Sequence, residues 1–560
     1  MRGTRCLVIG LDGATFDVLT PLFEAGKCPV LNRLVQEGAH ARLNSTTPPM
    51  TLPSWSSFLT GCNPGRHGIY DFTRRIPGTY RLELTNSTHR SVPTIHRVLS
   101  DRGLRTACLA MPTTYPPEKL DGVVISGFDS PIATSIDGRF CHPPEIYREI
   151  QSRFGGMAFA DFQELNIDEG WHVAALESLL TEIGRKEAIA TWMLEQERWE
   201  LFTLLFGESD TVSHHFWMFR ELGGPRYRDV PGLRDAIDRV YEALDAALGR
   251  LIEQAEPDVV CIASDHGFGG AGDVALYLNR FLEERGWLHF RRPTAPATGH
   301  ASSTHVLDRV REAALRYLPT GAQQGLFRLL PGRWIGAVES ASRWGDIDFE
   351  RTRAFSDEMN YAATIHLNVE GRDPLGCVVD RDQAVEEITA DLLDWEVDGQ
   401  RVVEKVWKRE EIYEGPCLER APDLVLELGL RDGFSYTVLP SGRSLPGQTW
   451  RRFEPEEHVG GKGLGMNGSH RQHGVLILHG HGVQAGVEVS AGMPDCAPTL
   501  LALLGQPIPE HCDGRVLRQA LEGVEVRWTE TVGLSRQGEQ SLSVVEAAEV
   551  TERLESLGYF

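Results

Sequence analysis

Residues 201–214 read LFTLLFGESDTVSH, a predominantly apolar run that is followed at once by polar residues. Such a run is expected of a strand that is buried on both faces, as in a parallel sheet covered by helices. The polar part contains Asp210 and His214, whose side chains can bind metal ions. Because open α/β sheets place their ligands beyond the carboxyl ends of the strands, this stretch predicts a buried parallel strand with a metal-type pair at its end.

The same alternation of apolar runs and helical patterns extends to both sides. Further strands are predicted at 7–10, 106–111 and 259–263, and helices at 29–38 and from Leu233, whose apolar residues keep helical spacing up to residue 251. Strands that alternate with helices predict an α/β fold with a mostly parallel central sheet flanked by helices.

This alternation is interrupted between about residues 271 and 350, where residues 291–304 are rich in Pro, Ala, Ser and Thr. We therefore expect an inserted cap there. The prediction for the whole chain is a core formed by 1–270 and 351–520, an insertion at 271–350, and a tail at 521–560 that ends in an amphipathic helix within 544–560.

The composition disfavours two classes of function. The chain of 560 residues has a formal net charge of −23, which would repel a nucleic-acid polymer. No run of 18 apolar residues suggests a membrane span. The N-terminal apolar run, 6–10, is too short for a signal peptide, and the ten cysteines show no CxxC spacing. We expect a cytoplasmic protein with reduced thiols.

Metal-type residues follow two further predicted strands. Asp12 comes after the first strand, and Asp265 and His266 come after the strand at 259–263. A single Asp in this position is usually a helix cap or a turn residue, but three strands that end in this way are a more specific signal. Carboxylates and imidazoles are good ligands for Zn²⁺ and Mn²⁺, and two such ions can clamp a phosphoryl group.

A hydroxyl group that could act as the nucleophile lies in Pro48–Gly61, which reads PPMTLPSWSSFLTG. Thr51 follows a Pro-rich turn and precedes a short helical segment. Either a helix N-cap or a nucleophile fits this position, because a helix N-terminus also stabilises an oxyanion. The composition of the segment does not decide between the two roles.

The order of these residues resembles the alkaline phosphatase superfamily: Asp12, Thr51, Asp210-x-x-x-His214, Asp265-His266 and a late Gly-x-His. The spacing from Thr51 to Gly61 is similar to the nucleophile motif of the type I phosphodiesterase/nucleotide pyrophosphatase branch. Several stretches also resemble a group of predicted phosphohydrolases or phosphomutases, namely 63–72, 114–117, 208–217, 497–505 and 553–559.

The resemblance implies an alkaline-phosphatase-like fold and a site with two divalent ions, for which zinc is expected and manganese is the alternative. Asp12, Thr51, Asp265 and His266 would hold one ion, and Asp210, His214 and a late histidine the other. It also implies that Thr51 attacks the phosphorus of a small phosphate ester and forms a phospho-enzyme intermediate, which water hydrolyses.

The late histidine is predicted to be His470. It precedes the apolar run at 475–478, as does His473, whereas His479 and His481 follow that run. A residue before a strand reaches the site only if that strand runs antiparallel to the others, as one strand does in related folds. His473 lies so close to the strand that a core or edge position is expected for it.

The remaining residues near these motifs have simpler explanations. His67 is expected to be structural, and His215 and Trp217 are expected to be pocket or core neighbours of His214. The glycines at 267, 269 and 270 are interpreted as turns near a crowded site.

Among the activities of the superfamily, phosphodiester hydrolysis is favoured. A sulfatase is disfavoured because no Arg follows Thr51-x-Pro, and a phosphoglycerate mutase because no domain is inserted after Thr51. The apolar neighbours Met50, Leu52 and Trp55 suit a diester with an organic group on each side. The alternatives are a phosphomonoesterase, a phospho-group transferase or phosphomutase on the same site, and a non-enzymatic metal-binding interaction module.

Overall fold

The computed structural model describes residues 4–130, 138–157, 170–291, 344, 347–358, 362–441, 444–459, 466–530 and 538–556. Its largest sheet confirms the predicted α/β fold. The strand order is β22 (Val487–Glu488), β2 (Ala39–Asn44), β21 (His473–Gly480), β9 (Val259–Ala263), β1 (Cys6–Leu11), β8 (Leu201–Phe206), β5 (Thr106–Leu109), β6 (Gly122–Ile125) and β7 (Cys141–His142), with β23 (Ala491–Gly492) beside β2.

The centre of this sheet is parallel. Strands β9, β1, β8, β5 and β6 all run in the same direction, and β8 begins and ends at the residues predicted for it. Two strands are reversed: β21 is antiparallel to both β9 and β2, and β7 is antiparallel to β6. The central strands consist almost entirely of buried residues because helices cover both faces.

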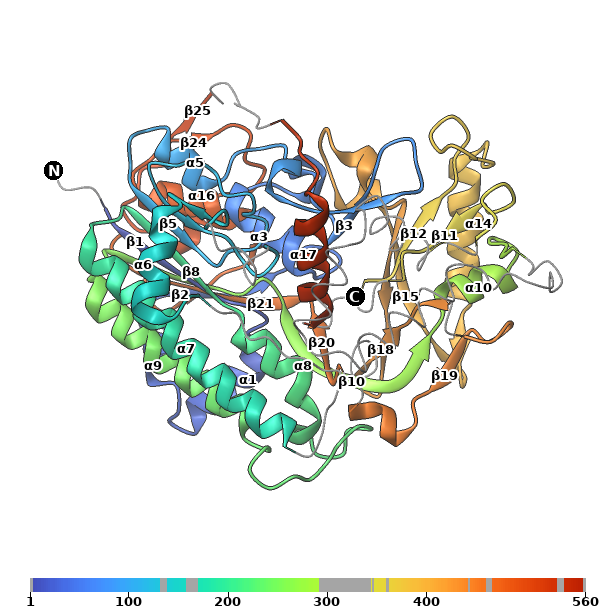
Figure 1. Ribbon diagram of the computed structural model, residues 1–560, viewed down its shortest axis with the longest axis horizontal. Coiled ribbons are helices and arrows are strands. Elements are labelled where there is room, and N and C mark those ends of the chain that lie inside the picture. Colours follow the sequence, from blue (N-terminus) through green and yellow to red (C-terminus); the bar gives the residue numbers. More distant parts are fainter. Residues whose placement is uncertain are drawn as a thin grey trace.

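Two groups of helices flank the sheet (Figure 1). One group packs around α9 (Ala236–Ala255) and contains α1 (Phe16–Glu24), α2 (Pro29–Glu37), α7 (Trp171–Gln196) and α8 (Glu208–Arg220). The other contains α3 (Thr51–Thr60), α5 (Ile95–Ser100) and α16 (Cys496–Leu503). The predicted apolar stripe of α9 is buried at Ile237, Val240, Leu244, Leu248 and Leu251.

A second lobe lies beside this core (Figure 1). One of its sheets contains β11 (Ala354–Phe355), β12 (Thr364–Leu367), β16 (Leu424–Leu428) and β15 (Val403–Lys408), near α14 (Arg381–Leu393) and α10 (Leu278–Glu284). The other contains β17 (Leu430–Arg431), β18 (Phe434–Val438), β10 (Gly267–Leu276) and β19 (Trp450–Arg452), with β20 (Gly468–Arg471) beside β10.

Strand β10 connects the core to the second lobe, and it corrects the interpretation of its glycines as turns. Gly267, Gly269 and Gly270 lie within β10. A Cβ atom on Gly267 would lie 2.2 Å from the carbonyl oxygen of His473, and one on Gly270 would lie 2.8 Å from the ring of Phe434. These glycines allow close packing inside a strand.

The predicted domain borders remain predictions, and most of the predicted insertion, 292–343, lies outside the described residues. The described residues nevertheless show where the cores lie. The prediction assigns 354–426 to the core, but most buried apolar side chains of this range belong to a cluster with Leu278, Phe281 and Trp287 that is separate from the main core under the central sheet.

Short elements complete the described chain: α4 (Pro64–His67), α6 (Glu145–Phe154), α15 (Arg409–Ile412), β3 (Thr73–Arg75), β4 (Leu82–Leu84), β13 (Glu396–Val397), β14 (Gln400–Arg401), β24 (Ile508–Pro509) and β25 (Trp528–Thr529). A helix near the C-terminus is present as α17 (Val544–Ser556). All ten cysteines are free. Within the described residues, no helix combines the length and the apolar character of a membrane span.

Candidate metal centre

Thr51 is the first residue of α3 and is fully buried. The preceding residue, Met50, has an extended backbone (φ −134°, ψ 141°), so the chain turns into the helix at Thr51. One turn later, Trp55 Nε1 donates a hydrogen bond of 3.1 Å to Asp12 Oδ2. The helix therefore places the Thr51 hydroxyl close to the end of β1, and it orients the Asp12 carboxylate at the same time.

Four of the predicted site residues meet around the ring of His266. Its Nε2 atom lies 3.3 Å from Asp265 Oδ2, 3.6 Å from Asp12 Oδ1 and 3.4 Å from Thr51 Oγ1. Asp265 is held in place by the backbone N–H of Gly13, which donates to its Oδ1 at 3.2 Å. The structure thus brings together the residues that follow β1 and β9 with the first residue of α3.

The other three predicted residues form an adjoining group. His214 Nε2 and His470 Nε2 lie 3.4 and 3.6 Å from Asp210 Oδ1, and 3.1 Å from each other. Asp210 Oδ1 is also 3.9 Å from His266 Nε2. Two sets of ligand atoms lie within 4.8 Å of one another, Asp210 with His214 and His470, and Asp12 with Asp210 and His266. Asp210 therefore belongs to both sets.

The three histidines all present Nε2 to this space. Each Nδ1 atom lies close to a backbone carbonyl oxygen: that of His214 is 3.0 Å from Gly468, that of His266 is 3.1 Å from Gly267, and that of His470 is 2.9 Å from Pro49. A carbonyl oxygen only accepts, so each Nδ1 carries a hydrogen, and in the neutral ring the lone pair of Nε2 faces this space.

This arrangement fits divalent cations. Two lone pairs that face each other across 3.1 Å repel unless a cation lies between them, and two nitrogens bound to one tetrahedral zinc ion lie roughly 3.3 Å apart. Asp12 Oδ1 and Asp265 Oδ2 are buried and accept no hydrogen bond from the described residues. A cation would satisfy both oxygens.

The electrostatics of the carboxylates point in the same direction. Burial, followed by the charges of Asp265 and Asp210, raises the pKa of Asp12 well above its ordinary value. Burial also raises the pKa of Asp265. For Asp210, burial acts to raise the pKa, but His214 and His470, when their rings are protonated, hold it far below its usual range. Since burial lowers the pKa of His266, its imidazole stays neutral and suits a ligand.

His470 reaches the group through strand pairing that is not visible in the sequence. It lies in β20, opposite Phe268 of β10, and β10 begins directly after His266. The predicted antiparallel direction of the strand after His470 is confirmed for β21. His473, the other candidate, begins β21 and is exposed, whereas His470 is buried in the cluster.

The neighbouring histidines make contacts outside the two ligand groups. His67 lies 3.0 Å from Ser57 Oγ through Nε2, and its Nδ1 accepts a hydrogen bond from the backbone N–H of Ile69. Burial lowers the pKa of His67 to about 3. His215 packs edge-on against Trp171, with ring centroids 5.3 Å apart. Two contacts were not predicted, the hydrogen bond from Trp55 to Asp12 and the ring of Phe268 packed 4.6 Å from that of His214.

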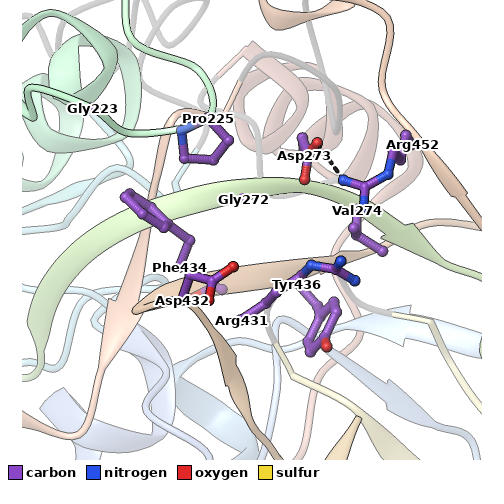
Figure 2. A pocket seen from close by; sticks show the side chains of 11 residues that line it. Gly223, Pro225, Gly272, Asp273, Val274, Arg431, Asp432, Phe434, Tyr436 and Arg452 are labelled. Carbon is purple, nitrogen blue, oxygen red and sulfur yellow. Dashed lines mark hydrogen bonds and ion pairs between the residues drawn. The ribbon is translucent and has the colours of Figure 1, made fainter. Parts of the chain in front are cut away.

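Two cavities lie near this region. The first, of about 400 Å³, has Pro48 and Met50 in its wall, and its apolar lining also includes Ile69, Leu82, Ala421 and Pro422. The second, of about 280 Å³, is lined by residues of β10, β18 and their surroundings (Figure 2). It contains none of the predicted site residues, and its Asp273 and Arg452 pair with each other at 2.7 Å. Neither lining includes a predicted site residue, but that of the first cavity contains Pro48 and Met50, and Met50 precedes Thr51 directly in the chain.

Comparison with known proteins identifies the family and the fold of the chain. A model of the type I phosphodiesterase/nucleotide pyrophosphatase family matches residues 6–443. Among solved structures, phosphonoacetate hydrolase from Sinorhizobium meliloti 1021, in complex with phosphonoformate, is similar with a TM-score of 0.50 and 17% identity, over 90% of this chain and 95% of that one. Murine ectonucleotide pyrophosphatase/phosphodiesterase 5 is similar with a TM-score of 0.45 and 13% identity, over the same shares of the two chains.

The first of these structures shows that the fold is the alkaline-phosphatase-like one, with a mostly parallel central sheet and additional small sheets. No curated protein matches the chain significantly. The family match covers more than three quarters of the sequence and contains every member of the two Asp/His groups suited to metal ions except His470. The chain belongs to the type I phosphodiesterase/nucleotide pyrophosphatase family, whose members are metal-dependent phosphoester hydrolases.

Proposed function

We propose that this protein is a two-metal phosphodiesterase with Thr51 as its nucleophile. One observation carries the proposal: six buried Asp and His side chains converge on the hydroxyl group of a threonine that begins a helix. In this proposal Asp12, Thr51, Asp265 and His266 hold one ion, and Asp210, His214 and His470 hold the other. Asp210 Oδ1 lies close to both groups and is placed to be shared.

Zinc is the proposed metal, because three imidazoles and three carboxylates form a donor set that zinc favours; manganese is the alternative. Two divalent ions would lower the pKa of the Thr51 hydroxyl and stabilise negative charge on the phosphoryl oxygens. The three hydrogen bonds from Nδ1 to backbone carbonyls keep the imidazoles of His214, His266 and His470 in the required orientation.

The side chains then act as follows. The Thr51 oxygen gives up its proton and bonds to phosphorus while the bond from phosphorus to the leaving oxygen breaks, and the leaving alkoxide takes up a proton to depart as the alcohol. Thr51 is at the N-terminus of α3, where the backbone N–H groups and the helix dipole favour negative charge on the phosphoryl group. Water then cleaves the phospho-threonine, which restores the hydroxyl group and releases a phosphate monoester.

The cavity beside Thr51 supports a diester over a monoester. A dianionic monoester is usually bound by an arginine that is available to it. Arg75 and Arg372 of this cavity are held by the buried acids Asp373 and Asp423 and are not available to it. The apolar part of the lining, which begins at Pro48 and Met50, instead suits the organic group of an ester.

The test is a comparison of chromogenic substrates with the purified protein, loaded with Zn²⁺ or with Mn²⁺. We expect kcat/KM for bis(4-nitrophenyl) phosphate to exceed that for 4-nitrophenyl phosphate by at least about tenfold, a difference of about 1.4 kcal/mol in transition-state stabilisation. A preference for the monoester would refute the diesterase assignment. Transfer of the phosphoryl group to an added alcohol, in preference to water, would indicate a transferase.

A further inference from the structure

The cavity beside Thr51 contains two kinds of arginine, which differ in their partners. Arg75 and Arg372 both pair with Asp373, and Arg372 also pairs with Asp423. The side chains of these two acids are 1% and 0% exposed, so these pairs are part of the interior of the second lobe. Arg75 and Arg372 are therefore not available to a ligand.

Arg74 and Arg420 are different because they share a partner from the far end of the chain, although Arg74 also pairs with Glu83 at 2.8 Å. Glu539 lies 3.0 Å from Arg74 Nη2 through Oε2 and 3.4 Å from Arg420 Nη2 through Oε1. All three residues line the cavity. The Glu539 side chain is 50% exposed, and half-exposed ion pairs are weak and exchangeable.

The segment that carries Glu539 is held in place by other contacts. The Gln540 N–H donates to Thr88 Oγ1 at 2.9 Å, and the Gln540 carbonyl accepts a hydrogen bond of 2.9 Å from Asn86 Nδ2. Ser541 Oγ donates to Glu83 Oε2 at 2.7 Å. Helix α17 then packs into the main core through Val550 and Leu554. The Glu539 carboxylate can therefore leave the two arginines while the segment stays in place.

We propose that Arg74 and Arg420 form a binding subsite for a second anionic group of the substrate, and that Glu539 fills this subsite when no substrate is bound. The proposal rests on the proposed function, because the cavity extends to Pro48 and Met50 beside Thr51. The substrate is then a phosphodiester whose organic part carries a carboxylate or a further phosphate. Two guanidinium groups suit such a group, since each can donate two parallel hydrogen bonds to its oxygens.

The experiment uses two probes that differ by one charge, 4-nitrophenyl 2-carboxyethyl phosphate and its methyl ester. The measured quantity is the KM of the charged probe divided by that of the ester. In Glu539→Gln, which removes the competing charge, we expect this ratio to fall about fivefold relative to the wild type, the factor for relief of one half-exposed ion pair. In Arg74→Met and Arg420→Met we expect the ratio to rise at least about threefold.

The matched control is Glu546→Gln, which removes the same charge from the same segment. Glu546 accepts a hydrogen bond from the Tyr115 hydroxyl and does not line the cavity, so the ratio should not change. An unchanged ratio in Glu539→Gln, or an equal fall in Glu546→Gln, would overturn the proposal while the diesterase stands.

A wild type that cleaves neither probe would instead contradict the proposed function. The subsite is then tested by calorimetric titration of the metal-loaded protein with succinate. Binding to Glu539→Gln at least about threefold tighter than to the wild type supports the subsite, and equal binding overturns it.

Discussion

The assignment of His470 as a metal ligand leads to a paired prediction. His470→Ala removes one of three side chains whose ligand atoms lie within 4.8 Å of one another and leaves Asp210 and His214. Two protein donors hold a divalent ion poorly, so the bound metal should fall from two ions per chain toward one. Removal of a partner that only orients a ligand costs about 10- to 100-fold in metal affinity, and loss of the ligand itself should cost more.

The same substitution affects the free energy of unfolding. The ring of His470 stacks on that of His266 with centroids 3.6 Å apart, and it also packs 5.5 Å from the ring of Phe268. Truncation of a large buried apolar side chain to Ala lowers the free energy of unfolding by about 2–5 kcal/mol. A smaller decrease is expected for His470→Ala, because its surroundings are polar. The variant should therefore fold, and its activity should fall by at least about 10³-fold.

The assay combines metal analysis by mass spectrometry with diester hydrolysis and circular dichroism. His473→Ala is the matched control, since His473 is exposed at the start of β21 and lies outside both ligand groups. It should keep two ions and near wild-type activity. Loss of an ion from His473→Ala, together with two ions in His470→Ala, would refute the geometric argument.

Three further predictions concern the same site. Thr51→Ala should lower kcat by at least about 10³-fold while most of the metal stays bound, measured against Thr51→Ser; retention of a tenth of the activity would exclude Thr51 as the nucleophile. Trp55→Phe removes the hydrogen bond to Asp12 and should weaken metal binding about 10- to 100-fold, measured by competition titration with a chelator. An unchanged metal affinity would show that this hydrogen bond does not orient the Asp12 carboxylate. Burial and neighbouring carboxylates raise the pKa of Asp12, and burial raises that of Asp265, so protons should compete with the metal for these carboxylates. The metal affinity should be highest above these raised pKa values and should fall as the pH is lowered through them. A metal affinity that does not change from neutral to acidic pH would contradict this.

Much of the fold follows from local patterns in the sequence. The run at Leu201–Phe206 predicts its strand correctly because a strand that is buried on both faces leaves a continuous apolar segment. The helix at residues 29–38 is recognised by its proline at the start and its glycine at the end. Asp12, Asp210, His214, Asp265 and His266 stand out because they follow strands whose carboxyl ends share one edge of a parallel sheet.

Other features depend on contacts between distant segments, which leave no periodic signal. The glycines of β10 were interpreted as turns because their reason for being glycine, close packing against His473 and Phe434, comes from residues far along the chain. The division of most buried apolar residues into two large clusters is equally invisible, since apolar strands such as Leu424–Leu428 occur in the second lobe as well as in the central sheet.

The sequence by itself determined the α/β fold, the order of the candidate ligands and the threonine at the start of a helix, because strand burial, helix ends and residue chemistry are local properties. Only the tertiary structure decided how these ligands meet. The pairing of β20 with β10 brings His470 to within 3.1 Å of His214, and α3 places Trp55 against Asp12. It also placed Glu539 against Arg74, 465 residues away, because the folding of the chain, and not its order, determines which side chains share a cavity.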